Sequence, residues 1–285
     1  MNERIFNWRL TGSVIFFVLS ISLSIFVWRA THLPRETEII FLSVGQGDAI
    51  LIRSGMTEIV IDAGVDGRLL LSRLGRHIPF WDRTIETVIA THSDRDHIGG
   101  FPSLFRSYRV LSALTNGYED GTGSEKSFLE AIESDGAHHE AIRSGTEIIL
   151  PNDGGILSVE YPNPHGKALT DKESNEGSVI IRFTYGESTF LLTGDLPREE
   201  SFLPSEQPVD ILKVAHHGSR FSTSDEFLDL IQPKEAVISV GKNSYGHPSQ
   251  EVIDRLMKRD IYIHRTDREG DIVYVCSNGK CQLKK

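Results

Sequence analysis

The sequence predicts one α/β domain built of two β-rich halves with helices on the outside. Strand-length apolar runs recur along the chain, amphipathic helical stretches separate them, and 285 residues are enough for one large domain or two small ones. The composition, 39% hydrophobic and 25% charged, is that of a folded protein. It excludes a disordered chain, a collagen and a coiled coil.

The chain is acidic, with 30 Lys and Arg against 40 Asp and Glu and a net charge of −10. A basic surface over the whole molecule, common in nucleic-acid-binding proteins, is therefore excluded, and a phosphate groove would have to be a local patch. Without residues 1–35, which hold four arginines and one glutamate, the charge becomes about −13. Charge alone would not draw this part of the chain to an anionic membrane.

Residues 1–35 are expected to form a short cytoplasmic segment, a transmembrane anchor and a linker. Residues 10–28 are uncharged and apolar, long enough to span a bilayer, and bounded by Arg9 and Arg29. A cleaved signal peptide and a buried core helix remain open, although small residues are lacking before a cleavage point. Because Arg4 and Arg9 favour a cytoplasmic N-terminus, we expect a single-pass membrane protein whose residues 36–285 lie outside the cytoplasm.

Cys276 and Cys281 flank Asn278-Gly279, the pair typical of a two-residue type I′ hairpin turn. This register places the two cysteines opposite each other, within disulfide range. We expect a cross-strand disulfide, which suits an extracytoplasmic domain. Two free thiols are the alternative.

The domain is expected to open with an antiparallel meander over residues 38–44, 49–53 and 58–62. Further helices are expected at 68–78, 97–108, 124–134, 225–231 and 250–259. Further strands are expected at 87–91, 110–114, 146–150, 156–161, 179–184, 190–193, 211–215, 236–240 and 261–264. Residues 162–176 form the longest predicted loop.

Four potential metal ligands follow the strand at 87–91 within six residues: His92, Asp94, Asp96 and His97. Imidazole and carboxylate ligands at such spacing are typical of divalent metal sites, and a solvated polar loop is the weaker interpretation.

Other predicted strands also end in ligand-type residues. Asp195 follows Thr193-Gly194, and His216 and His217 follow the strand at 211–215. Asp195 could instead cap a helix. Asp62 ends an early strand, where it could orient metal ligands.

These motifs resemble the metallo-β-lactamase superfamily, and more closely the metallo-hydrolase domain of ComEC-type competence proteins. The matching segments are residues 41–50, 61–64, 91–100, 191–195, 212–219, 245–248 and 265–267. The resemblance implies a metallo-β-lactamase-like αββα sandwich over residues 36–285, a hydrolase, and two divalent metal ions.

Two departures from the superfamily pattern affect the implied ligands. Position 94 is Asp where the superfamily has His, and no histidine lies between His165 and His216, so the usual third histidine is missing. The resemblance then implies one metal on His92, Asp94 and Asp195. It implies a second on Asp96, His97, Asp195 and one of the two adjacent histidines, with His216 preferred for the metal and His217 for the substrate. An oxygen-rich ligand set suits Mn²⁺ as well as Zn²⁺.

The reaction implied by the resemblance is phosphodiester hydrolysis, because two metals activate water and hold both oxygens of an in-line displacement. Asp96 and Asp195 would position the nucleophile. His247 would contact phosphate or protonate the leaving oxygen, or it merely precedes a helix. Ser178 and Ser219 are expected beside the ligands or the substrate.

Four basic residues fall next to these motifs and could line a phosphate groove: Arg95, Lys213, Arg220 and Lys242. His138 and His139 lie outside the motifs and are expected on the surface.

We therefore expect a nuclease or phosphodiesterase acting on DNA outside the cytoplasm, with DNA uptake as its role. The channel of ComEC-type proteins would then come from a separate membrane protein, or the enzyme acts alone on extracellular DNA or another phosphodiester. A hydrolase of another ester, such as a cell-wall phosphodiester or a lactone, and a non-catalytic metal-stabilised interaction domain remain alternatives.

Overall fold

The structure is a computed structural model that describes residues 8–32, 36–152, 154–163, 174–201 and 208–284. The chain divides into two compact units, Met1–Arg35 and Glu36–Lys285. Most of the loop predicted at 162–176 lies outside the described residues.

The first unit holds one helix, α1 (Trp8–His32), whose side chains are described over residues 12–24. In the part of the chain that the structure describes, no helix meets the length and apolarity needed for a membrane crossing. The predicted transmembrane anchor is therefore not supported.

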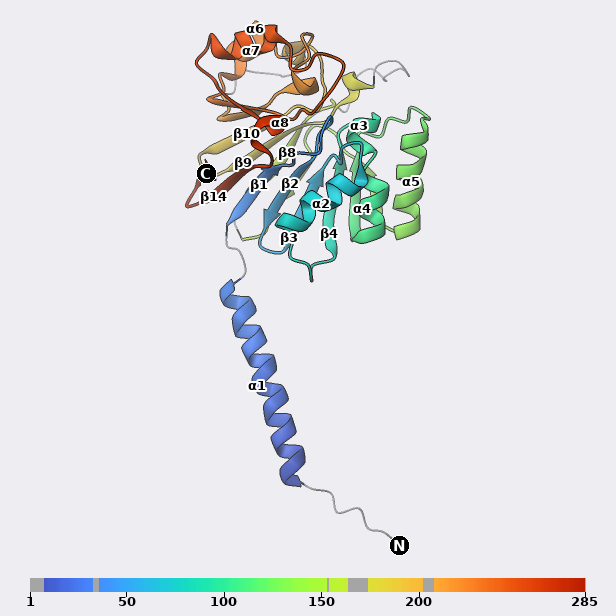
Figure 1. The fold of residues 1–285 in the computed structure, drawn as a ribbon, viewed down its shortest axis with the longest axis vertical. Helices are drawn as coiled ribbons and strands as arrows, with labels where there is room; N and C mark the ends of the chain where they lie inside the picture. The colour runs from blue at the N-terminus through green and yellow to red at the C-terminus, as the bar shows by residue number, and fades with distance from the viewer. Residues whose placement is uncertain (1–7, 33–35, 153, 164–173, 202–207, 285) are drawn as a thin grey trace. The chain divides into compact units, whose positions relative to one another are not determined.

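The second unit is built on two mixed β-sheets (Figure 1). The first has the strand order β15-β14-β1-β2-β3-β4-β5-β6. Its strands are β1 (Thr37–Phe41), β2 (Ile50–Ser54), β3 (Thr57–Ile61), β4 (Thr84–Ala90), β5 (Arg109–Thr115), β6 (His138–Ala141), β14 (Ile272–Ser277) and β15 (Lys280–Leu283).

The second sheet has the order β13-β12-β11-β10-β9-β8-β7. Its strands are β7 (Glu147–Ile149), β8 (Ile156–Tyr161), β9 (Ile180–Tyr185), β10 (Ser188–Leu192), β11 (Ile211–Lys213), β12 (Glu235–Ile238) and β13 (Tyr262–Arg265). Strands β10 to β13 run parallel, so their carboxyl ends meet at one edge. In the first sheet, β3 to β6 also run parallel.

Helices cover the outer face of each sheet. Figure 1 shows α2 (Gly67–His77), α4 (Phe101–Ser107) and α5 (Gly123–Asp135) along the first sheet, and α6 (Asp225–Ile231) with α7 (Gln250–Met257) over the second. The short helices are α3 (Arg95–Ile98) and α8 (Thr266–Glu269), with 3₁₀ turns η1 (Asn175–Gly177), η2 (Glu199–Ser201) and η3 (Ala215–Gly218).

Both faces of each central strand are buried, which explains the nearly continuous apolar runs in the sequence. Along β1, Ile39 and Phe41 join the core between the sheets, together with Phe190 of the second sheet. Ile40 belongs instead to the core under α2, α4 and α5. A third core lies under α6 and α7. The predicted αββα sandwich is thus confirmed.

Two details of the predicted elements differ. The helix expected at 97–108 breaks at Gly99-Gly100 into α3 and α4. The short strand β6 was not predicted, because all four of its residues are exposed and carry no apolar signal. Its His138 and His139 are on the surface, as expected.

The C-terminal hairpin confirms the disulfide. Strands β14 and β15 pair Cys276 with Cys281, and a disulfide joins the two residues. Asn278 and Gly279 both have positive φ angles, as a type I′ turn requires.

We predict that unreduced protein incorporates no alkylating reagent at either cysteine, measured by intact mass. Because the closed loop is short, replacing both cysteines with serine should lower the free energy of unfolding by no more than about 2 kcal/mol in urea denaturation. Two alkylated cysteines in the unreduced protein would contradict the bridge.

Candidate metal centre

The candidate ligands lie beyond the carboxyl ends of strands in both sheets. Asp62 follows β3, His92 follows β4, Asp195 follows β10 and His217 lies in η3 after β11. Strand ends leave side chains free to converge, because the backbone ladder stops there. Residues from distant parts of the sequence therefore meet at one place.

The larger of two clusters of candidate ligands among the described residues consists of Asp96, His97, Asp195 and His217, whose candidate ligand atoms all lie within 4.8 Å of one another. Asp195 Oδ2 is 3.3 Å from His97 Nε2 and 3.5 Å from His217 Nε2. Asp96 Oδ2 is 3.3 Å from His217 Nε2. Only Asp96 is partly exposed, so one side of the cluster is open to a ligand.

The donor set fits a divalent metal ion. His97 Nε2 and Asp195 Oδ1 are buried without a hydrogen-bond partner among the described residues. Leaving such atoms unpaired costs roughly 1–3 kcal/mol each, and a metal ion would satisfy both. Mixed imidazole and carboxylate ligands are those that Zn²⁺ and Mn²⁺ accept.

His92 and Asp94 lie beside this cluster. The ring centroids of His92 and His97 are 4.1 Å apart, and His92 Nε2 is 3.7 Å from Asp94 Oδ2. Among the residues that the structure describes, His92 Nε2 also has no hydrogen-bond partner. The interaction with His92 is the largest reason that the pKa of Asp94 falls to about 2. Asp94 lines the same cavity as Asp195, and His92 is linked to Asp195 through Ser178. Neither residue belongs to the cluster of candidate ligands.

A layer of hydrogen bonds holds the ligands in orientation. Asp62 Oδ2 lies 2.8 Å from His97 Nδ1 and accepts the Thr91 hydroxyl at 2.7 Å, while Asp62 Oδ1 accepts the Thr91 N–H. Such carboxylate contacts fix which ring nitrogen of a histidine faces the metal. On the other side, the Ser178 hydroxyl accepts the N–H of Asp195 and lies 3.4 Å from His92 Nδ1.

Asp48 and Lys213 form a buried ion pair beneath the cluster. Lys213 is 1% exposed; its Nζ donates to the Gly194 carbonyl at 2.8 Å and is 3.9 Å from Asp195 Oδ1. Asp48 Oδ1 is 3.5 Å from His217 Nδ1. Burial alone would raise the pKa of Asp48, but Lys213, His217 and His97 together outweigh it and hold the pKa below its usual range. Sequence reasoning gave Asp48 no role.

Lys213 is therefore not part of an exposed phosphate groove. Its side chain leaves the last residue of β11 toward the buried Asp48, since the strand lies in the interior of the second sheet. Arg220 is exposed but does not line the cavity described below, whereas Arg95 and Lys242 do.

The adjacent histidines occupy different positions. His217 is buried in the cluster, with Nδ1 2.9 Å from the Ser239 carbonyl oxygen. His216 is partly exposed, with Nε2 4.0 Å from Asp195 Oδ2. His217 lies nearer to Asp195 than His216 does, and it also contacts Asp96. The assignment of His216 to the metal remains a prediction.

The same buried charges set the protonation of the histidines. Burial lowers the pKa of His217, but Asp195 and Asp48 outweigh this effect and raise the pKa to about 10. Burial also lowers the pKa of His97, and Asp195 and Asp62 raise it well above its ordinary value. Bound metal would replace these protons as the compensating positive charge.

The cluster opens into a cavity of about 770 Å³. Asp94, Asp96, Asp195, His216 and His217 line it. The remaining lining residues are Gln46, Val65, Arg95, Lys242, Asn243, Ser244, Tyr245 and His247.

His247 lies in this cavity, with its ring centroid 5.5 Å from that of His216. Its Nδ1 is buried without a hydrogen-bond partner among the described residues. Ser219 is buried instead, and its hydroxyl accepts the N–H of Phe221, so the structure does not bring it to the cavity lining.

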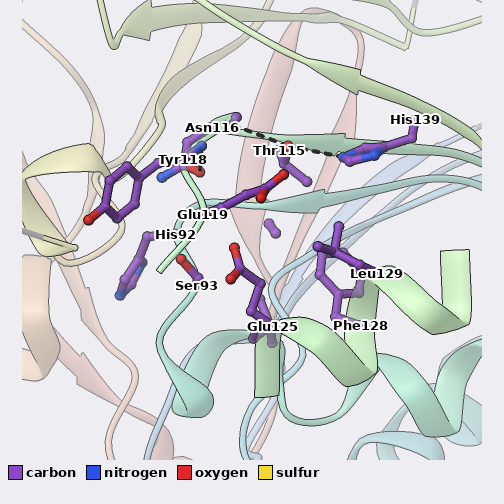
Figure 2. Close-up of a pocket in the computed structure, with 13 residues that line it drawn as sticks. His92, Ser93, Thr115, Asn116, Tyr118, Glu119, Glu125, Phe128, Leu129 and His139 are labelled. Carbon is purple, nitrogen blue, oxygen red and sulfur yellow. Dashed lines mark hydrogen bonds between the residues drawn. The ribbon is translucent and has the colours of Figure 1, made fainter. Parts of the chain in front are cut away.

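A second, much smaller pocket of about 40 Å³ lies against His92 and Ser93 (Figure 2). The loop carrying Asn116 and Tyr118 and the start of α5 form its walls. Glu125 there accepts the N–H of Gly121, as a capping residue does. The pocket has room for a few water molecules only.

The fold and the strand-end ligands define a metallo-hydrolase-type protein: two sheets packed face to face, with imidazole and carboxylate groups gathered at one edge. The chain belongs to the metallo-β-lactamase superfamily, whose family model, described as "Metallo-beta-lactamase superfamily", matches residues 42–242. The resemblance noted from the motifs is thereby confirmed.

Competence proteins are among its relatives. The chain is 32% identical over 272 residues to ComE operon protein 3 of Bacillus subtilis (strain 168), covering 86% of this chain and 34% of that protein. Competence protein ComA of Neisseria gonorrhoeae is 27% identical over 265 residues, covering 90% and 35%. Recombination protein 2 of Haemophilus influenzae is 28% identical over 240 residues, covering 81% and 28%. The chain spans about a third of the length of these relatives.

Solved structures support the fold. The metallo-β-lactamase fold protein YhfI from Bacillus subtilis aligns with a TM-score of 0.56 at 15% identity, covering 84% of this chain and all of that one. Zn²⁺-bound PqqB from Methylobacterium extorquens aligns with a TM-score of 0.52 at 13% identity, covering 77% and 85%.

We predict that Lys213→Met destabilises the metal-free protein by about 3–5 kcal/mol, because the buried Asp48 carboxylate loses its partner. The double variant Asp48→Asn with Lys213→Met should regain much of that loss in urea denaturation. The pairing would be contradicted if the double variant were as unstable as Lys213→Met, or if the losses of stability from the two substitutions simply added.

We also predict that the protein binds Mn²⁺ or Zn²⁺ and that Asp195→Asn weakens the binding at least tenfold, measured by calorimetric titration. Asp254→Asn, which alters an exposed carboxylate on α7, is the matched control and should leave the affinity unchanged. Unaltered affinity in Asp195→Asn would show that the metal binds elsewhere.

Proposed function

We propose that the chain is a metal-dependent phosphodiesterase that cleaves DNA. The observation that carries the proposal is the four-residue cluster of Asp96, His97, Asp195 and His217, open on the side of Asp96 to a cavity large enough for a substrate. Divalent metal ions at such a centre supply positive charge that activates water and stabilises charge developing on a phosphate.

The protein's own residues would position the reactants. The N–H of Asp195 donates to Ser178, and its Oδ2 lies near both His97 Nε2 and His217 Nε2, so Asp195 would hold the metal together with these two histidines. Asp96 is partly exposed at the cavity and would orient the attacking water. His247 has an unpartnered ring nitrogen in the same cavity, from which it would contact the phosphate or protonate the leaving oxygen.

Two exposed bases supply local attraction for a polyanion. Arg95 and Lys242 line the cavity, and no ion pair joins either to an acid among the described residues. This local charge offsets the acidity of the rest of the chain, and ions bound at the carboxylates would add to it.

The proposed biological role is DNA uptake, supported by the relatives named Competence protein ComA and Recombination protein 2. The chain spans about a third of the length of these relatives. A separate membrane protein that passes the DNA is part of the proposal. The uncharged run at residues 10–28 leads us to propose that the enzyme is attached to a membrane and acts outside the cytoplasm.

We predict that the 285-residue chain cleaves a single-stranded oligodeoxynucleotide and bis(p-nitrophenyl) phosphate in Mn²⁺ or Zn²⁺. Asp96→Ala and Asp195→Ala should each lower kcat/KM about 100-fold or more, since each removes a group that holds the reacting centre. His139→Ala, an exposed histidine on β6, is the matched control.

The outcomes separate the alternatives. Cleavage of the small diester with DNA untouched under every metal would overturn the nuclease proposal and favour another phosphodiester. Bound metal without cleavage of either substrate would favour a non-catalytic interaction domain.

A further inference from the structure

An exposed aromatic side chain stands at the rim of the metal-centre cavity. Tyr245 lines the cavity and is 75% exposed. A single exposed aromatic residue is common on protein surfaces. Whether Tyr245 binds a ligand therefore depends on the residues around it.

The loop that carries Tyr245 is held rigidly by Asn243. The Asn243 amide donates to the carbonyls of Gly241 at 2.9 Å and His247 at 2.8 Å. Its side-chain oxygen accepts the N–H groups of Tyr245 and His247, both at 3.1 Å. A loop ordered before binding loses little conformational entropy when a ligand arrives.

Gly241 anchors the start of this loop against the first sheet's β1–β2 connection. A Cβ added at Gly241 would lie 2.4 Å from the backbone carbon of Gly45. The close approach therefore requires glycine and fixes the loop at the cavity.

Two successive ring contacts connect Tyr245 at the cavity rim, through His247, with His216 beside the candidate metal centre. The Tyr245 and His247 centroids are 5.8 Å apart with planes tilted by 30°, and His247 lies 5.5 Å from His216. His216 Nε2 is 4.0 Å from Asp195 Oδ2. A flat group joined to a phosphate at the centre would thus lie within reach of the Tyr245 ring.

We propose that Tyr245 stacks a nucleobase next to the cleaved phosphodiester, so the enzyme selects strands whose bases are unpaired. The inference rests on the proposed phosphodiesterase function. Stacking on an aromatic side chain tolerates any sequence, because every base has a π face. In a duplex those faces are covered by neighbouring pairs. Arg95 and Lys242, exposed in the same cavity, would attract the backbone.

The experiment compares two fluorescein-labelled 12-mers: oligothymidylate, and a strand of the same length made of abasic tetrahydrofuran units. Binding to the 285-residue chain is followed by fluorescence anisotropy in Ca²⁺, and cleavage is followed in Mn²⁺. We expect oligothymidylate to bind about tenfold more tightly, equivalent to about 1.4 kcal/mol. Tyr245→Ala should abolish that preference by weakening only the base-bearing strand, and Tyr245→Phe should keep it.

The chain offers a matched control in Tyr262. It is 70% exposed and lies 5.4 Å from His264 at 37°, close to the geometry of Tyr245 and His247, but it does not line the cavity. Tyr262→Ala should change neither binding nor cleavage. Unchanged melting temperatures would show that the Tyr245 variants are folded.

Equal weakening of both strands by Tyr245→Ala, or loss of the preference in Tyr245→Phe, would overturn the stacking role. Equal cleavage of both strands by the wild type would also overturn it while leaving the proposed phosphodiesterase function intact. Absence of all cleavage, with a Tyr245-dependent preference in binding, would overturn the proposed catalytic function and support the stacking role.

Discussion

The structure depends on a group of buried charged side chains at the edge where the two sheets meet. Asp48, Asp62 and Asp195 are buried together with His97, His217 and Lys213. Removing an ion from water costs several kcal/mol, and the cost is recovered only when opposite charges and hydrogen bonds surround it. The contacts of Lys213 with Asp48 and of His97 with both Asp62 and Asp195 provide this compensation. Divalent ions would complete it.

The backbone conformation around the centre follows from the need to compensate these buried charges. Asp62, His216 and His217 all have positive φ angles, between 49° and 57°, which non-glycine residues rarely adopt. Such conformations persist when surrounding contacts hold them, and they gather at functional sites. Close packing also constrains Gly47, because an added Cβ would lie 2.1 Å from the Asp96 carbonyl oxygen. The turn after β1 must therefore lie directly against the metal-binding motif.

Local patterns were sufficient for most of the fold and for the ligand motif. Apolar strands with turns between them predicted the opening meander, and the density of ligands after β4 predicted the centre. The sequence could not show that Lys213 forms a buried ion pair. Its neighbours in the chain are motif residues, whereas its partner, Asp48, is 165 positions away. The role of Asp48 depends on packing between β1–β2 and the second sheet. Strand β6 went unpredicted because edge pairing needs no apolar side chains.

The acidic charge of the chain is compatible with a polyanionic substrate once these positions are known. Several of its carboxylates belong to the buried centre, while Arg95 and Lys242 are exposed at the cavity, where no ion pair joins either of them to an acid that the structure describes. Asn243 is uncharged and takes no part in the proposed reaction. Its hydrogen bonds hold His247 and Tyr245 at that cavity. The centre and the rim are thus built by different loops, so substrate preference and metal binding can vary independently.

The most direct test is a crystal structure of the protein soaked in Mn²⁺, with anomalous scattering recorded to locate the metal. We expect an anomalous peak surrounded by Asp96, His97, Asp195 and His217. A well-ordered crystal with no peak at these residues, or with peaks only elsewhere on the molecule, would contradict it.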